Sequence, residues 1–180
     1  MKLTRKQLTK KQRRVIDYLT SLGDATRLNE YKARLEKRAE ERAAAREESK
    51  RQNAEAMKSV KVGDVFSCTW GYDQTNVDFF QVVALVGKNS VRLRQVHPVL
   101  VKDDATGPMA SNRTYAINAG EMLPAAKHSV FIKDQANGDV KRIQGGTYHG
   151  EVRPYITLSS YAWAYPEKPG LTKHYESWYA

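Results

Sequence analysis

The densest group of hydrogen-bonding and aromatic side chains lies at positions 70–82, where the sequence reads WGYDQTNVDFFQV. The phenol of Tyr72 and the amides of Gln74 and Asn76 suit the recognition of a ligand. Asp73, Thr75 and Asn76 are also residue types that stabilise turns by bonding nearby backbone groups. The stretch therefore fits two interpretations, a structural turn or a ligand-facing rim limited to Tyr72, Gln74 and Asn76.

Candidates for catalysis are scattered along the chain. Asp73, Asp78 and His149 are the nearest to an acid or base, but catalysis needs such groups at a defined geometry. The sequence contains no phosphate-binding loop, dinucleotide fingerprint or nucleophile elbow, and its four histidines do not stand at metal-ligand spacing. We therefore predict a protein that is not an enzyme and uses no cofactor or metal, with a small hydrolase built on Asp78 or His149 as the last alternative.

The cysteine content and the hydropathy of the sequence indicate the cellular compartment. Cys68 is the only cysteine, which excludes an internal disulfide framework and fits a small buried hydrophobe in a strand. No stretch approaches the roughly 18 to 20 consecutive apolar residues of a membrane span, and no apolar segment follows the basic residues 1–6. We expect a cytoplasmic protein.

The net charge of +10 is unevenly distributed. Residues 1–60 hold 17 Lys and Arg against 9 Asp and Glu, whereas residues 61–180 hold 13 against 11. A basic block of this kind attracts nucleic acid or another acidic surface, although it also solvates a helix. The cations expected to bind are Lys10, Lys11, Arg13, Arg14, Arg34, Arg38, Arg42 and Arg46.

The first third of the sequence predicts a helical arm, residues 1–58. Apolar residues at near-helical spacing indicate a helix over 4–22, and a composition of Ala, Glu, Lys, Arg and Gln favours one long helix over 27–57. The run 8–19 resembles the first helix of some bacterial winged-helix repressors, but no recognition helix follows. Beyond Leu35 the long helix is polar all round, so it is either a solvated arm or a segment that docks on a partner.

From residue 60 the apolar pattern changes to the period of two that is typical of strands. Phe66, Cys68 and Trp70 share one face of the first strand, and residues 76–86, apolar on both faces, indicate a central strand covered on both sides. Residues 91–96 alternate cleanly, with Arg92 and Arg94 outward as further candidates for partner binding.

Further along, the pattern is interrupted by turn residues. His97-Pro98 either interrupts the strand before it or marks it as an edge strand, and residues 102–112 have the composition of a loop. Residues 129–144 predict a hairpin, with strands 130–133 and 140–143 around Asn137-Gly138, which Gly145-Gly146 then breaks. A further strand is expected over 155–163.

These elements predict an α+β protein, with the basic helical arm followed over residues 60–180 by a small, elaborated antiparallel β-barrel of SH3-like or KOW-like type. An open sandwich is the runner-up. Seven of the 17 aromatic residues lie in the last 26 positions, interleaved with Lys168, Lys173 and His174. They suit either the stacking of unpaired bases or the half-buried side of strands.

The segment 62–86, above all the motif at 70–82, resembles a group of small proteins encoded by phages, plasmids and other mobile elements. The ends of such proteins are also similar to residues 159–165 and 173–178. The resemblance implies an accessory protein acting inside a host bacterium, where such proteins bind nucleic acid or block a defence complex of the anti-CRISPR or anti-restriction kind. Two partners follow as expectations: nucleic acid, DNA or RNA, or a host nucleoprotein defence complex.

Overall fold

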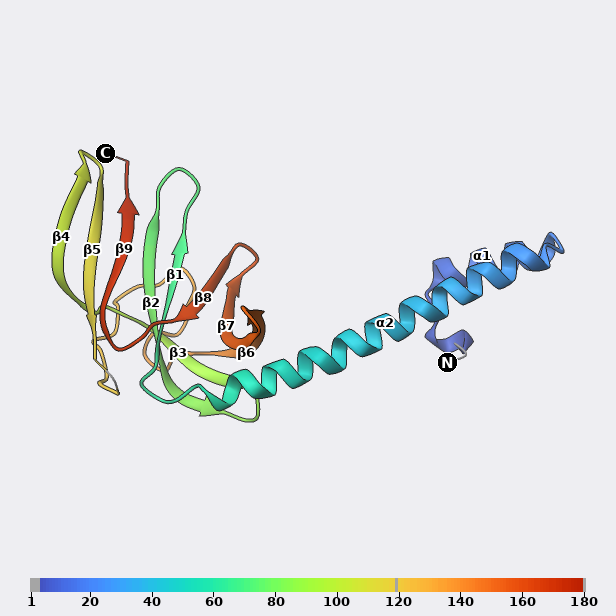
Figure 1. The fold of residues 1–180 in the computed structure, drawn as a ribbon, viewed down its shortest axis with the longest axis horizontal. Coiled ribbons are helices and arrows are strands. Elements are labelled where there is room, and N and C mark those ends of the chain that lie inside the picture. The colour runs from blue at the N-terminus through green and yellow to red at the C-terminus, as the bar shows by residue number, and fades with distance from the viewer. Residues whose placement is uncertain (1–3, 119, 180) are drawn as a thin grey trace. The chain divides into compact units, whose positions relative to one another are not determined.

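The computed structural model describes residues 4–118 and 120–179, and the chain forms two compact units, residues 1–50 and residues 51–180. Figure 1 shows the order of elements, in which helices come first and strands follow. The predicted α+β class, with a long N-terminal helix followed by a closed antiparallel barrel, is confirmed.

The first unit contains a short 3-10 helix η1 (Arg5–Gln7), helix α1 (Lys10–Ser21) and most of helix α2 (Ala25–Lys58). The single helix predicted over 4–22 is interrupted, because Thr9 starts α1 with a capping box. Its hydroxyl accepts a hydrogen bond from the backbone N–H of Gln12 at 3.2 Å, and the side-chain oxygen of Gln12 accepts one from the N–H of Thr9 at 2.7 Å. None of the described helices combines the length and the apolar character needed to cross a membrane.

In the second unit, six of the described strands pair antiparallel into a closed barrel in the order β1-β2-β3-β6-β7-β8. Their bounds are β1 Val65–Trp70, β2 Asn76–Val86, β3 Ser90–Val96, β6 Asp139–Tyr148, β7 Glu151–Ser159 and β8 Ala162–Pro166. Alternation places Phe66 and Cys68 in the barrel core, where Phe80, Leu93 and Ile156 also have no exposed surface. Trp70 packs against this core, which confirms the predicted face of β1.

The last turns of α2, residues 51–58, belong to the barrel unit. Ala56 and Val60 are buried in the barrel core. Gly145 meets this helix end and donates a backbone hydrogen bond to the side-chain oxygen of Asn53 at 2.8 Å. The prediction that Gly145-Gly146 breaks the strand is therefore wrong, because both glycines lie within β6.

A second sheet, in the order β4-β5-β9, lies beside the barrel within the same unit (Figure 1). It contains β4 (Val99–Gly107), β5 (Ala110–Ile117) and β9 (Gly170–Ser177). The predicted loop over 102–112 is wrong, because those residues form the β4–β5 hairpin. Phe79, Val96 and Ile117 pack in a second core, so β2 is covered on both faces as predicted.

Two other strand predictions are corrected. Residues 130–133 are not a strand, because the Ser129 hydroxyl accepts the backbone N–H groups of Phe131 and Ile132 and folds them into a turn. The side chains of Phe131 and Ile132 are buried in the barrel core. The segment 155–163 belongs to two strands, β7 and β8, which are paired with a register shift between Thr157 and Ser159.

Candidate nucleic-acid interface

Three of the predicted cations line one groove of the helical unit. Arg38, Arg42 and Arg46 stand four residues apart on α2, a spacing that keeps successive side chains on neighbouring positions of one helix face. They border a hollow of about 410 Å³ whose other wall includes Gln7 and Gln12. We call this the arginine groove. Within the described residues none of its three arginines forms an ion pair, so their charge is directed to solvent.

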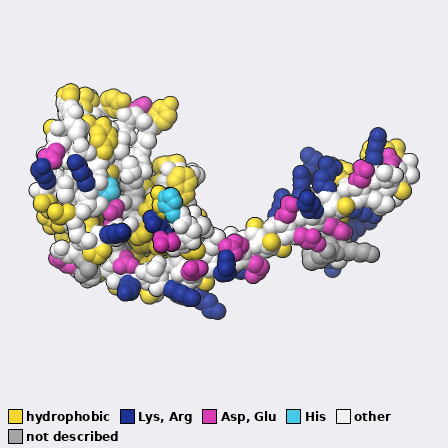
Figure 2. Space-filling model, in the orientation of Figure 1, with side chains coloured by type: hydrophobic (Ala, Val, Ile, Leu, Met, Phe, Trp, Pro, Cys, Tyr) yellow, Lys and Arg dark blue, Asp and Glu magenta, His cyan; other side chains and the backbone are white. Residues whose placement is uncertain are grey.

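The capping box at the start of α1 also borders this groove, since Thr9 and Gln12 are among its lining residues. The first turn of a helix carries unpaired N–H groups and a partial positive charge, which favour an anion nearby. Lys10 and Lys11 occupy that turn and are exposed. Figure 2 shows the dark-blue Lys and Arg side chains gathered over this helical unit.

The remaining arm cations are arranged differently. Arg13 donates from Nε to the backbone oxygen of Leu8 at 3.0 Å and lines a separate hollow that also holds the Arg5–Asp17 ion pair. The guanidinium of Arg34 lies 5.6 Å from the ring centre of Tyr31. Arg14 is exposed on α1. The structure therefore brings together three of the eight predicted arm cations and leaves the others spread over α1 and α2.

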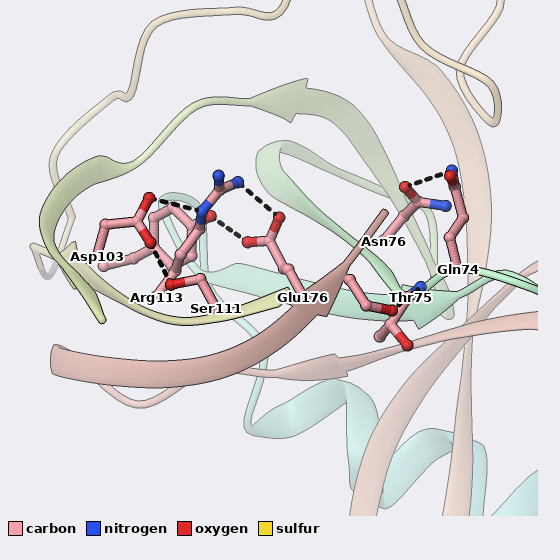
Figure 3. Close-up of polar contacts among 9 residues, drawn as sticks. Gln74, Thr75, Asn76, Asp103, Ser111, Arg113 and Glu176 are labelled. Atoms are coloured by element: carbon pink, nitrogen blue, oxygen red, sulfur yellow. Dashed lines mark hydrogen bonds and ion pairs between the residues drawn. The ribbon is translucent and has the colours of Figure 1, made fainter. Parts of the chain in front are cut away.

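The predicted rim lies in the turn between β1 and β2. Tyr72 is 100% exposed, and the Gln74 amide donates to the side-chain oxygen of Asn76 at 3.0 Å (Figure 3). Asn76 is half-buried, and its Nδ2 finds no partner among the described residues. Gly71 makes the tight turn possible, because a Cβ at this position would lie 1.9 Å from the Gln74 carbonyl oxygen. Tyr72 and Gln74 are thus presented to solvent, whereas Asn76 also supports the turn.

Arg92 and Arg94 face away from the barrel core and are only partly exposed to solvent. Both are half-buried, and each donates to a backbone carbonyl: Arg92 Nη1 to Gly138 at 3.0 Å and Arg94 Nη2 to Leu123 at 3.4 Å. They hold the loop that follows β5 and precedes β6. These bonds give Arg92 and Arg94 a structural role. The partner binding predicted for them stays a prediction.

A charged network in the second sheet holds another arginine. Arg113 on β5 bonds Asp103 of β4 at 3.1 Å and Glu176 of β9 at 3.0 Å, as Figure 3 shows, and its guanidinium lies 5.1 Å from the ring centre of Trp178. Ser111 donates to the same Asp103 carboxylate. These bonds tie three strands together and neutralise the cation within the protein.

Two half-buried carboxylates have shifted pKa values. Burial raises the pKa of Asp78, although Trp70 Nε1 at 2.7 Å and Gln95 Nε2 at 2.8 Å both donate to it and oppose the shift. Burial would also raise the pKa of Glu167, but hydrogen bonds from His174, Ser67 and Thr172 outweigh it and hold this pKa below its ordinary value. Both carboxylates accept hydrogen bonds from neighbouring side chains.

The other candidates for chemistry are placed as follows. His149 occupies the turn between β6 and β7 with a positive φ of 50° and packs against the ring of Tyr148 at 4.3 Å between ring centres. Across the ranges 4–118 and 120–179, no three His, Cys, Asp or Glu side chains are grouped so that they could hold a metal ion.

The C-terminal aromatic residues are mostly exposed. Tyr161, Trp163, Tyr165, Tyr175, Trp178 and Tyr179 all present much of their surface to solvent, and Tyr155 is half-buried. Exposure alone does not make them a stacking surface, since the Trp178 ring already lies against the Arg113 guanidinium and the Tyr161 ring lies 6.2 Å from that of Phe131.

Sequence reasoning did not select Gln7 or Gln12 as lining residues of the arginine groove. The signal was present in the spacing of Thr9 and Gln12, which is that of a capping box and marks a new helix start.

Comparison with protein-family models, with curated proteins and with solved structures finds no match to this chain.

Proposed function

We propose that this protein is an accessory protein of a mobile element that binds nucleic acid, or a nucleoprotein complex, through its basic helical arm. The arginine groove carries the proposal. Three guanidinium groups from Arg38, Arg42 and Arg46 border one hollow of a size that admits a phosphodiester segment. Guanidinium groups bind phosphate oxygens through paired N–H donors, and contacts of this kind dominate nucleic-acid affinity.

The chemistry of the groove fits backbone contact. Its other polar residues, Gln7, Thr9 and Gln12, offer amide and hydroxyl groups that suit phosphate and sugar oxygens. Such contacts position a strand without reading its sequence. We therefore expect affinity that depends weakly on base sequence and falls steeply with salt.

The test is a titration of fluorescently labelled single- and double-stranded DNA and RNA, followed by anisotropy between about 50 and 200 mM salt. Binding whose affinity falls linearly on a log–log plot against salt supports the proposal. Absence of binding to all four forms at the lowest salt overturns it.

A protein inhibitor of a bacterial defence complex is the second candidate. The observation that favours it is the fully exposed Tyr72 at the tip of the β1–β2 turn, since exposed tyrosines are enriched at protein interfaces. Capture from a host lysate with and without nuclease separates the two functions. A stoichiometric protein partner that survives nuclease treatment supports inhibition, and loss of all captured material on nuclease treatment supports nucleic-acid binding.

A further inference from the structure

The outer face of β6, β7 and β8 carries an aromatic surface that the helical arm does not include. Tyr148, Arg153, Tyr155 and Tyr165 line a cleft of about 540 Å³, and we call these four residues the aromatic platform. Tyr148 is 56% exposed and Tyr165 is 57% exposed. Exposed aromatic rings that gather in one cleft are typical of a binding surface.

Strand register explains why these rings point outward. Ile143 and Ile156 pair across β6 and β7 inside the core, so the neighbouring pair Gln144 and Tyr155 faces the other side. Arg153 pairs with Gly146, whose missing side chain leaves one part of the half-buried Tyr155 ring open to the cleft. On β8, Ala164 is buried and the next residue, Tyr165, faces outward.

The geometry of the platform suits flat ligands. The rings of Tyr155 and Tyr165 are 6.3 Å apart between centres and inclined by 33°, and the guanidinium of Arg153 lies 4.7 Å from the ring centre of Tyr148. The two tyrosine rings are tilted and both line the cleft, so a planar group can stack on either ring. Aromatic side chains combined with an arginine are the usual means by which proteins hold unpaired bases.

We infer that the aromatic platform stacks the unpaired bases of single-stranded nucleic acid, while Arg153 contacts a phosphate of the same strand. The inference rests on the proposed nucleic-acid binding and deepens it, because stacking of this kind requires bases that are not paired in a duplex. Arg153 now shares an ion pair with Glu151 at 3.4 Å. Both partners are exposed, so the pair is weak and a phosphate can replace the carboxylate.

Two exposed cations on the outer face of these strands, Arg142 of β6 and Arg153 of β7, favour this occupant over a neutral, proline-rich peptide, which aromatic grooves of small barrels also accept. Glu151, the partner of Arg153, offsets one of these two charges. A peptide gains nothing from this charge, whereas a polyanion does.

The experiment compares two labelled 12-mers bound to the full chain at one salt concentration, oligothymidylate and an abasic strand with the same phosphates. The platform predicts that the base-bearing strand binds about tenfold tighter, since each stacked base adds to the phosphate contacts. Equal affinity for the two strands overturns the platform and leaves the arginine groove intact. Absence of binding to either strand overturns the proposed function, and the platform with it.

Variants of the platform tyrosines test which rings produce the preference for the base-bearing strand. The double variant Tyr148→Leu/Tyr165→Leu keeps apolar side chains but removes two rings, and should reduce the tenfold preference to about twofold without changing the affinity for the abasic strand. Tyr165→Phe should retain the preference. The matched control is Tyr175→Leu on β9, because Tyr175 is 50% exposed but lies outside the platform. A double variant that melts like the wild type and keeps the full preference contradicts the inference.

Discussion

Gly145 of β6 lies directly against the backbone carbonyl of Gln52 in α2. A Cβ built on Gly145 would be 2.3 Å from the Gln52 oxygen and 2.5 Å from its carbonyl carbon. Both residues belong to the barrel unit, and the backbone N–H of Gly145 donates to Asn53. The glycine at 145 is thus required because a helix backbone approaches the strand, and not because the strand ends there.

Replacing this glycine tests the contact. Gly145→Ala should lower the free energy of unfolding by about 1–3 kcal/mol, because the helix end must move away from the barrel core. Urea unfolding measures the change. Gly146→Ala is the matched control, because its Cβ would meet only the Tyr155 ring at the ordinary distance of 3.4 Å. Equal stability of the two variants would show that the helix end does not press on β6.

The Glu167 carboxylate gives a pH-dependent prediction. Its pKa is lower in the folded state than the ordinary value of 4.5, so its contribution to stability is present above pH 4.5 and is lost as the pH falls through the lowered pKa. Glu167→Gln should therefore cost about 1–3 kcal/mol at pH 7, where the charged acceptor of the Thr172 and His174 bonds is lost. The difference from the wild type should shrink below pH 4.5.

Thermal or urea unfolding from pH 3 to pH 8 measures this difference. Glu151→Gln serves as the control, because the Glu151 carboxylate is exposed and its ion pair with Arg153 is worth little. A Glu167→Gln deficit that stays constant across the whole pH range is inconsistent with the proposed role of the carboxylate charge.

Cys68 should be inert in the native protein. Burial, with a smaller contribution from the charge of Asp78, raises the pKa of its thiol to about 11. At pH 8 only about 0.1% of the thiol is then ionised, and the thiolate is the reactive form. A thiol reagent should therefore label the folded chain no faster than the chain unfolds, and label it at once in urea. The variant Cys68→Ala/Ser49→Cys supplies the rate for an exposed thiol on α2, and a wild-type rate equal to it would contradict the burial of Cys68.

The sequence predicts the barrel strands whose two faces differ. In β3, the buried Val91 and Leu93 alternate with the half-buried Arg92 and Arg94, and this alternation in the sequence shows which face of the strand packs inward. The β4–β5 hairpin shows no such alternation in its sequence. Lys102, Asp103 and Asp104 lie in a strand that is exposed along most of its length. The other neighbour of β5 is β9, which is more than 50 residues distant in sequence, so the three-stranded sheet cannot be recognised from a local pattern.

The candidate site is predictable to a similar degree. Composition identifies the basic arm, and the four-residue spacing of its arginines places Arg38, Arg42 and Arg46 on one side of α2. The arginine groove also needs a second wall, which includes Gln7 and Gln12 from η1 and α1. The spacing of the arginines does not predict that wall. The aromatic platform is harder to foresee, because Tyr148 and Arg153 stand on either side of a turn and only strand register brings them to one face.

The arginine groove predicts a salt effect that net charge alone does not. The triple variant Arg38→Ala/Arg42→Ala/Arg46→Ala should reduce the slope of log affinity against log salt for a single strand by about 2, because each lost phosphate contact removes roughly 0.7. The charge-matched control is Lys88→Ala/Lys127→Ala/Lys133→Ala, which removes three exposed cations from the barrel unit. That control should leave the slope nearly unchanged. Anisotropy titrations at four salt concentrations give both slopes, with circular dichroism confirming that the helices persist. Equal slope reductions in the two triple variants would mean that the whole basic surface, and not the groove, attracts the strand.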